Sequence, residues 1–192
     1  MRTMKADDLG VDHEVRIFNK TDSFGLADKF LRDSIRQEKP DYIYVHLGIN
    51  DLHKKRSLST IMAAFDEFVL FVDEEVPHSK LIFSMPLLNG NKNTYPQILE
   101  LRERMYNMIT TMDTKTGFGN RDILFNPNTN FFKKDSDGHV VRTAQSTELF
   151  DTVKGDYIHL SQVGQRVIRA NFRHMIHRIT SEVEESYGHR YF

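Results

Sequence analysis

Two short groups of polar residues have the types and spacing that could do chemistry. The first is Gly48-Ile49-Asn50-Asp51, which directly follows the β-branched and aromatic run Tyr42–Leu47. A glycine lets the backbone turn sharply, and Asn50 could then donate an amide N–H to a bound oxyanion. Gly, Asn and Asp are also common in ordinary turns, so this group alone fits either interpretation.

The second group is the pair Asp156 and His159, which lies in the segment Gly155–Leu160. A carboxylate three residues before a histidine in a turn can hold one imidazole tautomer. It can also stabilise the imidazolium that forms when the histidine takes a proton. An acidic loop before an exposed histidine at a helix start would explain the same residues. The pair alone is therefore either a general base with its orienting acid or part of a surface loop.

The elements that must position these groups alternate between strand and helix patterns. Strands are predicted at Val15–Phe18, Tyr42–Leu47, Lys80–Met85 and Asp122–Phe125. Helices are predicted at Leu26–Gln37, from a cap at Ser57 or Ser59 to Val76, over Ile98–Met112, and from about Ser161 to Glu185. This alternation indicates βαβ units and a parallel sheet, in which ligands bind beyond the carboxyl ends of the strands. Asn50 follows such a strand and stands where a site is expected.

A long connection separates the last predicted strand from the last helix. About thirty residues between Phe125 and Gly155 have no helical pattern, and long loops in compact domains are often functional or mobile. Part of this loop is predicted to be a hairpin, because Phe131–Lys134 and His139–Arg142 flank the turn signal Asp135–Gly138.

The composition limits the kinds of protein that this chain can be. The 192 residues fit one domain, preceded by a polar segment over residues 1–14, and 39% hydrophobic residues suffice for a core. That first segment has no apolar run, so it is read as neither a signal peptide nor an anchor. Cysteine is absent, which excludes thiol catalysis and fits a reducing compartment. We therefore expect a soluble, cytoplasmic protein without a membrane span.

The formal charge of −1 offers no general attraction to nucleic acid or to an anionic membrane. The net charge does not exclude a local basic patch. Metal binding is not predicted, since His174 and His177 have no evident third ligand and lie on a basic helix face with Arg166, Arg169 and Arg173.

Together, the two polar groups resemble the SGNH or GDSL-type hydrolases. That family has a Gly-x-Asn-Asp block and an Asp-x-x-His block, which Gly48–Asp51 and Asp156–His159 match about 110 residues apart, with Leu160 and Gly164 following as expected. The likeness runs from about Val15 to Ile179. It implies a flavodoxin-like three-layer α/β/α sandwich with a parallel sheet, an acyl-transfer site, and no cofactor.

The resemblance also implies roles for individual residues. Asn50, with Gly48 shaping its turn, would be the side-chain donor to the oxyanion. His159 would be the general base and Asp156 its orienting acid. The family's second block supplies a backbone N–H to the oxyanion hole. Here Gly25, or an N–H between Thr21 and Ser23, would have to serve.

The sequence departs from the family in the first block. Gly-Asp-Ser normally follows a first strand that lies between the second and third strands, but the stretch before Val15 contains no serine. Val15–Phe18 is then the second strand, and the first appears to be missing because the chain is incomplete or because its neighbours close up. Ser23, in Asp22-Ser23-Phe24, is a weaker candidate nucleophile, since it leaves no room for a further strand and helix before Gly48.

Two functions of different classes follow. One is hydrolysis of ester bonds in a small-molecule, carbohydrate or lipid substrate, through His159, Asp156 and Asn50. The other is a catalytically inactive domain of the same fold that serves as a binding module for RNA or protein. Retention of both polar groups favours the hydrolase, and the absence of a first-block serine favours the binding module. The sequence defines neither the ester nor the oligomeric state.

Overall fold

The computed structural model describes residues 2–4, 15–18, 20–87, 95–115, 123–125, 132–134, 140–142 and 159–182. Its main sheet has three parallel strands in the order β3 (Tyr42–Val45), β4 (Lys80–Ser84) and β5 (Ile123–Phe125). Tyr42 pairs with Lys80 and Val45 with Phe83, so β3 and β4 run side by side over the whole length of β3. The parallel sheet predicted from the alternating pattern is confirmed.

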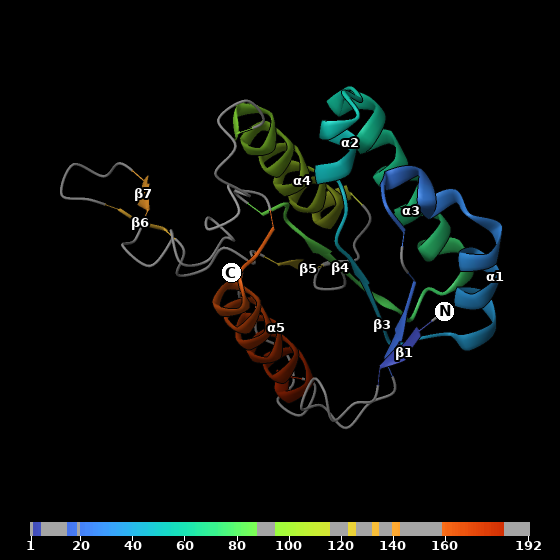
Figure 1. Cartoon of the computed structure of the whole chain (residues 1–192). Helices are drawn as coiled ribbons and strands as arrows, with labels where there is room; N and C mark the ends of the chain where they lie inside the picture. The colour runs from blue at the N-terminus through green and yellow to red at the C-terminus, as the bar shows by residue number, and fades with distance from the viewer. Residues whose placement is uncertain are drawn as a thin grey trace.

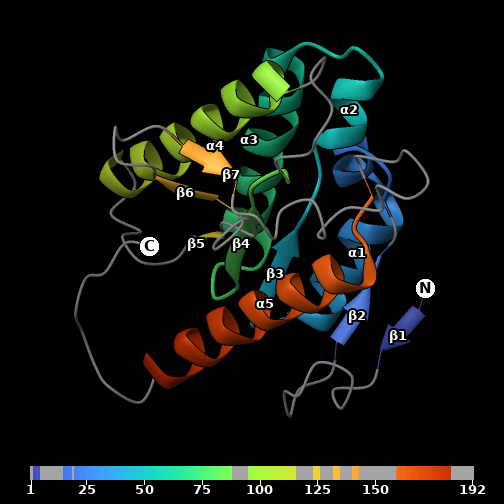
Figure 2. The same cartoon turned by 60° about the vertical axis from the view of Figure 1, so that its left-hand side comes forward.

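Helices cover both faces of this sheet. Helices α1 (Lys29–Glu38), α3 (Leu58–Glu75) and α4 (Tyr95–Lys115) lie on one side, and α5 (Gln162–Glu182) lies on the other (Figures 1 and 2). Alternate strand residues point to opposite faces, so each face can supply a separate core. Residues Ile43, Val45, Leu81 and Phe83 join the core with α1, α3 and α4, whereas Ile82 packs with Ile179 of α5. The predicted three-layer α/β/α arrangement is confirmed.

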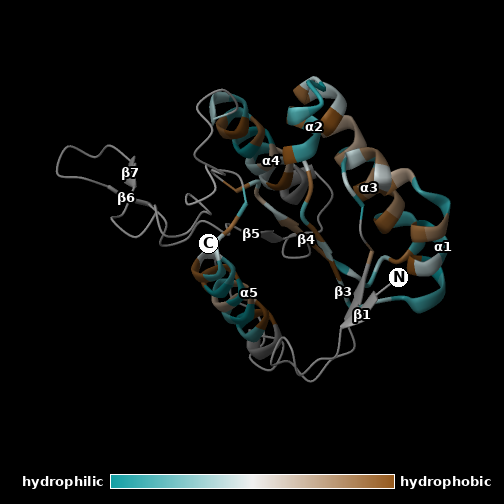
Figure 3. Cartoon of the chain, in the orientation of Figure 1, coloured by the Kyte–Doolittle hydropathy of each residue, from teal (hydrophilic) through white to brown (hydrophobic). Residues whose placement is uncertain are grey.

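The stripes of apolar residues read from the sequence are the buried faces of the helices (Figure 3). In and just after α3, the residues at intervals of three or four are at most 1% exposed: Ile61, Phe65, Phe68, Val72 and Val76. In α4 the corresponding residues Ile98, Leu101 and Met105 are also at most 1% exposed, and Met108 is 8% exposed. Full burial stabilises by about 1.5–3 kcal/mol for each such side chain, and this fixes the helices on the sheet.

Local signals set the helix ends. Ser57, one of two predicted caps, accepts a hydrogen bond from the Thr60 N–H at 3.2 Å at the start of α3. Asp28 caps α1 by accepting from the Leu31 N–H at 3.0 Å. The prediction of one helix over Leu26–Gln37 was wrong at its start. The 3₁₀ helix η2 (Ser23–Ala27) ends there, and α1 begins only after Asp28.

The N-terminal strands differ from the expected topology. β2 (Val15–Ile17) pairs antiparallel with β1 (Arg2–Met4), which lies in the segment that the sequence marked only as polar. The placement of Val15–Phe18 as the second strand of the parallel sheet was therefore wrong. Within the described ranges β3 is hydrogen-bonded only to β4, so no described strand occupies the edge where the resemblance puts the first strand.

The predicted hairpin in the long connection is confirmed. β6 (Phe132–Lys134) pairs antiparallel with β7 (Val140–Arg142). Its predicted turn and most of the rest of that connection, including Asp156, lie outside the described residues. Among the described residues, no helix is long and apolar enough to cross a membrane.

Candidate functional site

Gly48 allows the chain to turn from β3 into α2 (Ile49–His53). Its φ is +112°, in the region that favours glycine, and a Cβ built there would lie 2.9 Å from Leu101 Cδ2 of α4. Both the backbone angle and the close packing therefore exclude a larger residue. The Gly48–Asp51 group, expected to be a turn, forms the first turn of a short helix, and Asn50 lies in it.

Asn50 joins the two segments that were expected to supply oxyanion donors. Its Nδ2 donates to the Thr21 carbonyl oxygen at 2.7 Å, and the residue is exposed. A side-chain amide has two N–H groups, so this bond leaves a second donor on the same nitrogen. The structure thus brings Asn50 together with the Thr21–Gly25 segment at the end of β3.

A buried carboxylate, that of Asp51, holds this segment in place. Its oxygens accept the Ser23 N–H at 2.9 Å, the Ser23 Oγ–H at 2.8 Å and an Arg56 N–H at 2.7 Å, and both Asp51 and Ser23 have 0% exposure. The sequence analysis included Asp51 in the Gly48–Asp51 group but missed its contact with Ser23, because a contact between residues 28 apart leaves no local pattern. The Ser23 hydroxyl is closed off from solvent and already bound, which is the geometry of a structural residue.

A second carboxylate, Asp22, binds the loop after α2. It forms ion pairs with Lys54 and Arg56, and the hydrogen bond from Lys54, followed by that from Arg56, lowers its pKa below the ordinary value of 3.8. The Arg56 guanidinium also lies 3.8 Å from the centre of the Phe24 ring. Lys54 and Arg56, two cations of the basic run His53–Arg56, therefore hold the start of η2 against the loop after α2.

The backbone donors of this segment are partly used. The Gly25 N–H donates to the Asp22 carbonyl at 3.0 Å, inside η2, and the Ser23 N–H is bound to Asp51. Within the part of the chain that the structure describes, the Thr21 and Asp22 N–H groups have no acceptor. Of these two, the Thr21 N–H is the candidate oxyanion donor beside Asn50, because the Asp22 N–H points away from the Thr21 carbonyl oxygen that Asn50 binds.

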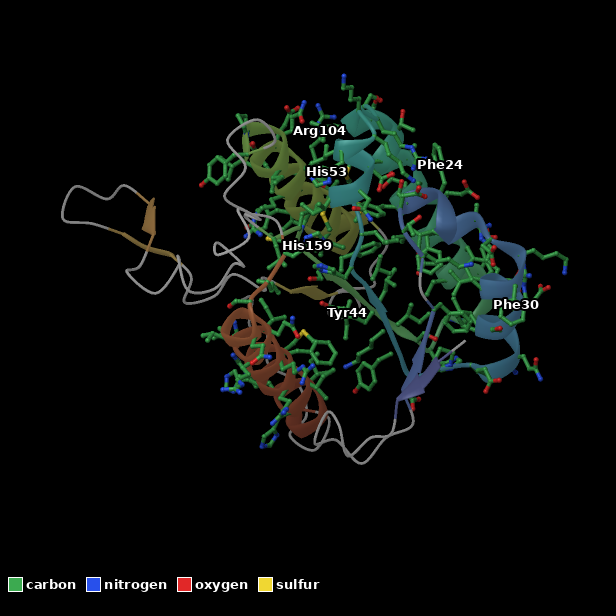
Figure 4. All side chains as sticks on the ribbon, viewed as in Figure 1. Phe24, Phe30, Tyr44, His53, Arg104 and His159 are labelled. Carbon is green, nitrogen blue, oxygen red and sulfur yellow. The ribbon has the colours of Figure 1, made fainter. Side chains whose placement is uncertain are left out.

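His159 lies exposed on the turn that leads into α5 (Figure 4). The next residue, Leu160, belongs to an apolar cluster with Leu87, which follows β4, so the start of α5 is held at the carboxyl end of the sheet. Ser161 caps the helix, since its Oγ accepts the Gly164 N–H at 3.1 Å. Asp156, the expected partner of His159, is outside the described residues, so their pairing stays a prediction.

A serine–histidine contact lies at the same end of the sheet. His46, which follows β3, has its Nδ1 2.8 Å from Ser84 Oγ at the end of β4, and its ring stacks on Tyr44. Part of His46 stays exposed, but its packed surroundings disfavour the charged form and lower its pKa from 6.5. Ser84 is fully buried. Alternation along β3 could have placed Tyr44 and His46 on the face of α5, but not the bond to Ser84.

Two further observations concern a cavity and the question of a metal site. A cavity of about 440 Å³ opens between η2 and α3, with Ser23, Phe24, Ala63 and Glu67 among its lining residues, and neither Asn50 nor His159 lines it. Within the described ranges, no group of three or more His, Asp and Glu side chains could hold a metal ion.

Comparison of this chain with known proteins finds similarity in structure only. No family model and no curated protein matches the sequence. A protein assigned to the G-D-S-L family of lipolytic proteins, from Desulfitobacterium hafniense, superposes with a TM-score of 0.62 at 16% identity, over 88% of this chain and 83% of that one. A carbohydrate esterase of family 3 from Talaromyces cellulolyticus gives 0.62 at 13% identity, over 84% and 69%. A variant of an acetyl esterase, solved with an acetate ion, gives the same values.

These solved structures superpose on more than four fifths of this chain. The resemblance that the Gly48–Asp51 and Asp156–His159 groups carry in the sequence is thus confirmed for the fold. The chain has the three-layer α/β fold of the SGNH, or GDSL-type, hydrolases.

Proposed function

We propose that this chain is an ester hydrolase domain with His159 as general base, oriented by Asp156, and with Asn50 as oxyanion donor. The observation that carries the proposal is the 2.7 Å hydrogen bond from Asn50 Nδ2 to the Thr21 carbonyl. It sets the Asn50 amide, which keeps a second N–H, beside Thr21, whose backbone N–H has no acceptor within the described residues. A cluster of N–H donors is what a developing oxyanion requires.

The reaction proceeds in two halves. His159 takes the proton of a serine hydroxyl while the serine oxygen attacks the ester carbonyl carbon, and the carbonyl oxygen becomes an oxyanion. The Asn50 amide and the Thr21 N–H stabilise that charge. Collapse of the tetrahedral intermediate expels the alcohol, which takes the proton from His159. Water then repeats the sequence on the acyl-enzyme and releases the acid.

The nucleophile of this proposal is neither Ser23 nor Ser84. Ser23 and Ser84, the two described serines nearest Asn50 and His46, are fully buried and hydrogen-bonded. A nucleophile must instead reach the substrate carbonyl carbon. We therefore assign the nucleophile to a serine other than Ser23 and Ser84.

The proposed substrate is an ester with a small acyl group, in a small molecule, a carbohydrate or a lipid. Support comes from the solved structures of the same fold, whose names include an acetyl esterase and a carbohydrate esterase. Acetyl esters are accordingly the first substrates to try.

A second candidate function is that of an inactive domain of this fold, serving as a binding module. The specific observation in its favour is the hydrogen bonding of Ser23 to Asp51, which makes this serine a structural residue. The two functions differ in whether any serine of the chain is activated.

Labelling with a fluorophosphonate, which reacts with activated serines, tests this difference. The hydrolase proposal predicts one modified serine by peptide mass spectrometry, other than Ser23 and Ser84. Labelling should be lost in His159→Ala and kept in His174→Ala, a matched exposed histidine on α5. Absence of labelling in the parent chain would reject the hydrolase in favour of the binding module. Labelling at Ser23 would overturn the assignment of the nucleophile.

A further inference from the structure

The outer face of α5 carries a row of cations on a protein with nearly balanced charge. From Gln162 to Ser181 the sequence has four arginines and two histidines but no Asp or Glu, although the whole chain has a formal charge of −1. Three of the arginines, Arg166, Arg169 and Arg173, are exposed, as is His177. They recur at intervals of three and four residues, so they form one stripe along the helix. Figure 4 shows the nitrogen ends of side chains along the outer side of α5.

The arginines of this stripe differ from those on the other helices. Arg32 pairs with Glu67 at 2.8 Å, Arg36 with Glu75 at 2.8 Å, and Arg104 with Glu100 at 2.7 Å. By contrast, Arg166, Arg169 and Arg173 have no anionic partner within the described part of the chain. Three neighbouring positive charges repel one another, so an external anion with several charges would stabilise this face.

The geometry suits a polymer of phosphates. At about 1.5 Å per residue, Arg166 and Arg173 are separated by roughly 10 Å along a straight helix, and Arg169 lies between them. The planar guanidinium binds phosphate oxygens in a bidentate manner, which a lysine ammonium does not. The stripe contains arginine and no lysine.

Other partners fit this face less well. Among the described residues of α5, Val163 is the one large apolar side chain that is well exposed, at 45%. A helix that inserts into a bilayer surface needs a broad apolar face, and the centre of a protein interface is rich in aromatic and apolar residues. The inner, apolar face of α5 is already packed on the sheet through residues such as Phe172, Met175 and Ile179.

We propose that the outer face of α5 binds the phosphodiester backbone of nucleic acid through Arg166, Arg169 and Arg173. Binding is independent of base sequence, because the described part of this face exposes no Phe, Tyr or Trp side chain on which bases could stack. The surface is separate from Asn50 and His159, so the proposal stands whether or not the chain is a hydrolase.

Fluorescence anisotropy with labelled oligonucleotides tests the proposal. The probes are single-stranded DNA, single-stranded RNA and duplex DNA of about 20 nucleotides, with titrations from about 50 to about 200 mM salt. For a single strand, contacts to three phosphates predict a slope of about −2 for the logarithm of the binding constant against the logarithm of salt concentration. The combined change Arg166→Gln, Arg169→Gln and Arg173→Gln should weaken binding at least about tenfold at low salt.

A matched control removes the same number of charges elsewhere. Lys29→Gln, Arg36→Gln and Arg104→Gln lie on α1 and α4 and change the formal charge equally. This variant should bind within about twofold of the parent chain, since it leaves the stripe intact. Equal loss in the two triple variants would contradict the proposal. So would failure of the folded parent chain to bind any probe at about 100 μM, or binding to phosphatidylserine vesicles in place of oligonucleotides.

Discussion

Ser23 donates both its backbone N–H and its hydroxyl to the carboxylate of Asp51, at 2.9 and 2.8 Å. This double contact ties the segment after β2 to the helix after β3. It sets Thr21 where Asn50 can bind it, so the arrangement of the proposed oxyanion donors depends on a buried charge that itself cannot touch a substrate.

Removal of this carboxylate should destabilise the fold. Asp51→Ala leaves the Ser23 donors and an Arg56 N–H without their acceptor in a fully buried site, which should lower the free energy of unfolding by about 3–5 kcal/mol. Urea denaturation followed by circular dichroism measures the change. Asp33→Ala, an exposed carboxylate on α1, should stay close to the parent chain. Equal stability of the Asp51 and Asp33 variants would show that the buried contacts contribute little.

Gly48→Ala should also destabilise the protein, against the usual direction of such a change. Replacement of glycine by alanine at a compatible site stabilises by about 0.4–1 kcal/mol. At Gly48 the φ of +112° and the contact with Leu101 should instead cost about 3 kcal/mol. Thermal unfolding is a suitable measurement. An unchanged or raised melting temperature would mean that β3 enters α2 by a different backbone path.

His46 should make stability depend on pH in mildly acidic solution. Burial lowers its pKa below 6.5, so from pH 6.5 downward the unfolded chain binds a proton that the folded chain does not. The contribution of the neutral His46 ring to the free energy of unfolding is therefore fully present above pH 6.5. It is lost as the pH falls from 6.5 through the lowered pKa of His46. His46→Gln should flatten this part of the profile. An imidazole titration by NMR at or above pH 6.5 would contradict the expectation.

The sequence predicted those parts of the fold in which local pattern and burial agree. The spacing of Ile61, Phe65 and Phe68 at intervals of three and four predicts α3, because a helix that buries one face needs apolar residues at these intervals. Likewise, the β-branched and aromatic run Tyr42–Leu47 predicts β3. The start of α1 was missed, because Leu26 continues the apolar pattern of the helix while Asp28 interrupts its backbone with a cap.

The candidate site was predicted only in part. The Gly48–Asp51 motif pointed to Asn50, and its position after a strand put it at the sheet end. The partners of Ser23 and His46 lie 28 and 38 residues away, so tertiary contacts alone reveal them. The antiparallel pairing of β2 with β1 was missed too, because Arg2–Met4 is short and lies in a polar stretch.

Asn50→Ala should impair hydrolysis without a matching loss of stability. Loss of one oxyanion donor lowers kcat by about 10²–10³. The Asn50 side chain is exposed, and within the described residues it makes one hydrogen bond, 2.7 Å to the Thr21 carbonyl oxygen, so the fold should tolerate its removal. The kcat for an acetyl ester and the melting temperature, measured together, separate the two effects. A full loss of both would assign Asn50 a structural role.

Hydrolysis of p-nitrophenyl acetate by the parent chain, His159→Ala and His174→Ala tests the central claim most directly. We expect turnover above buffer for the parent chain and for His174→Ala, and a loss of about 10³-fold or more for His159→Ala, because no other group would take the serine proton. Equal turnover in all three proteins, or none in the folded parent chain, would contradict the assignment of His159 as the general base of an ester hydrolase.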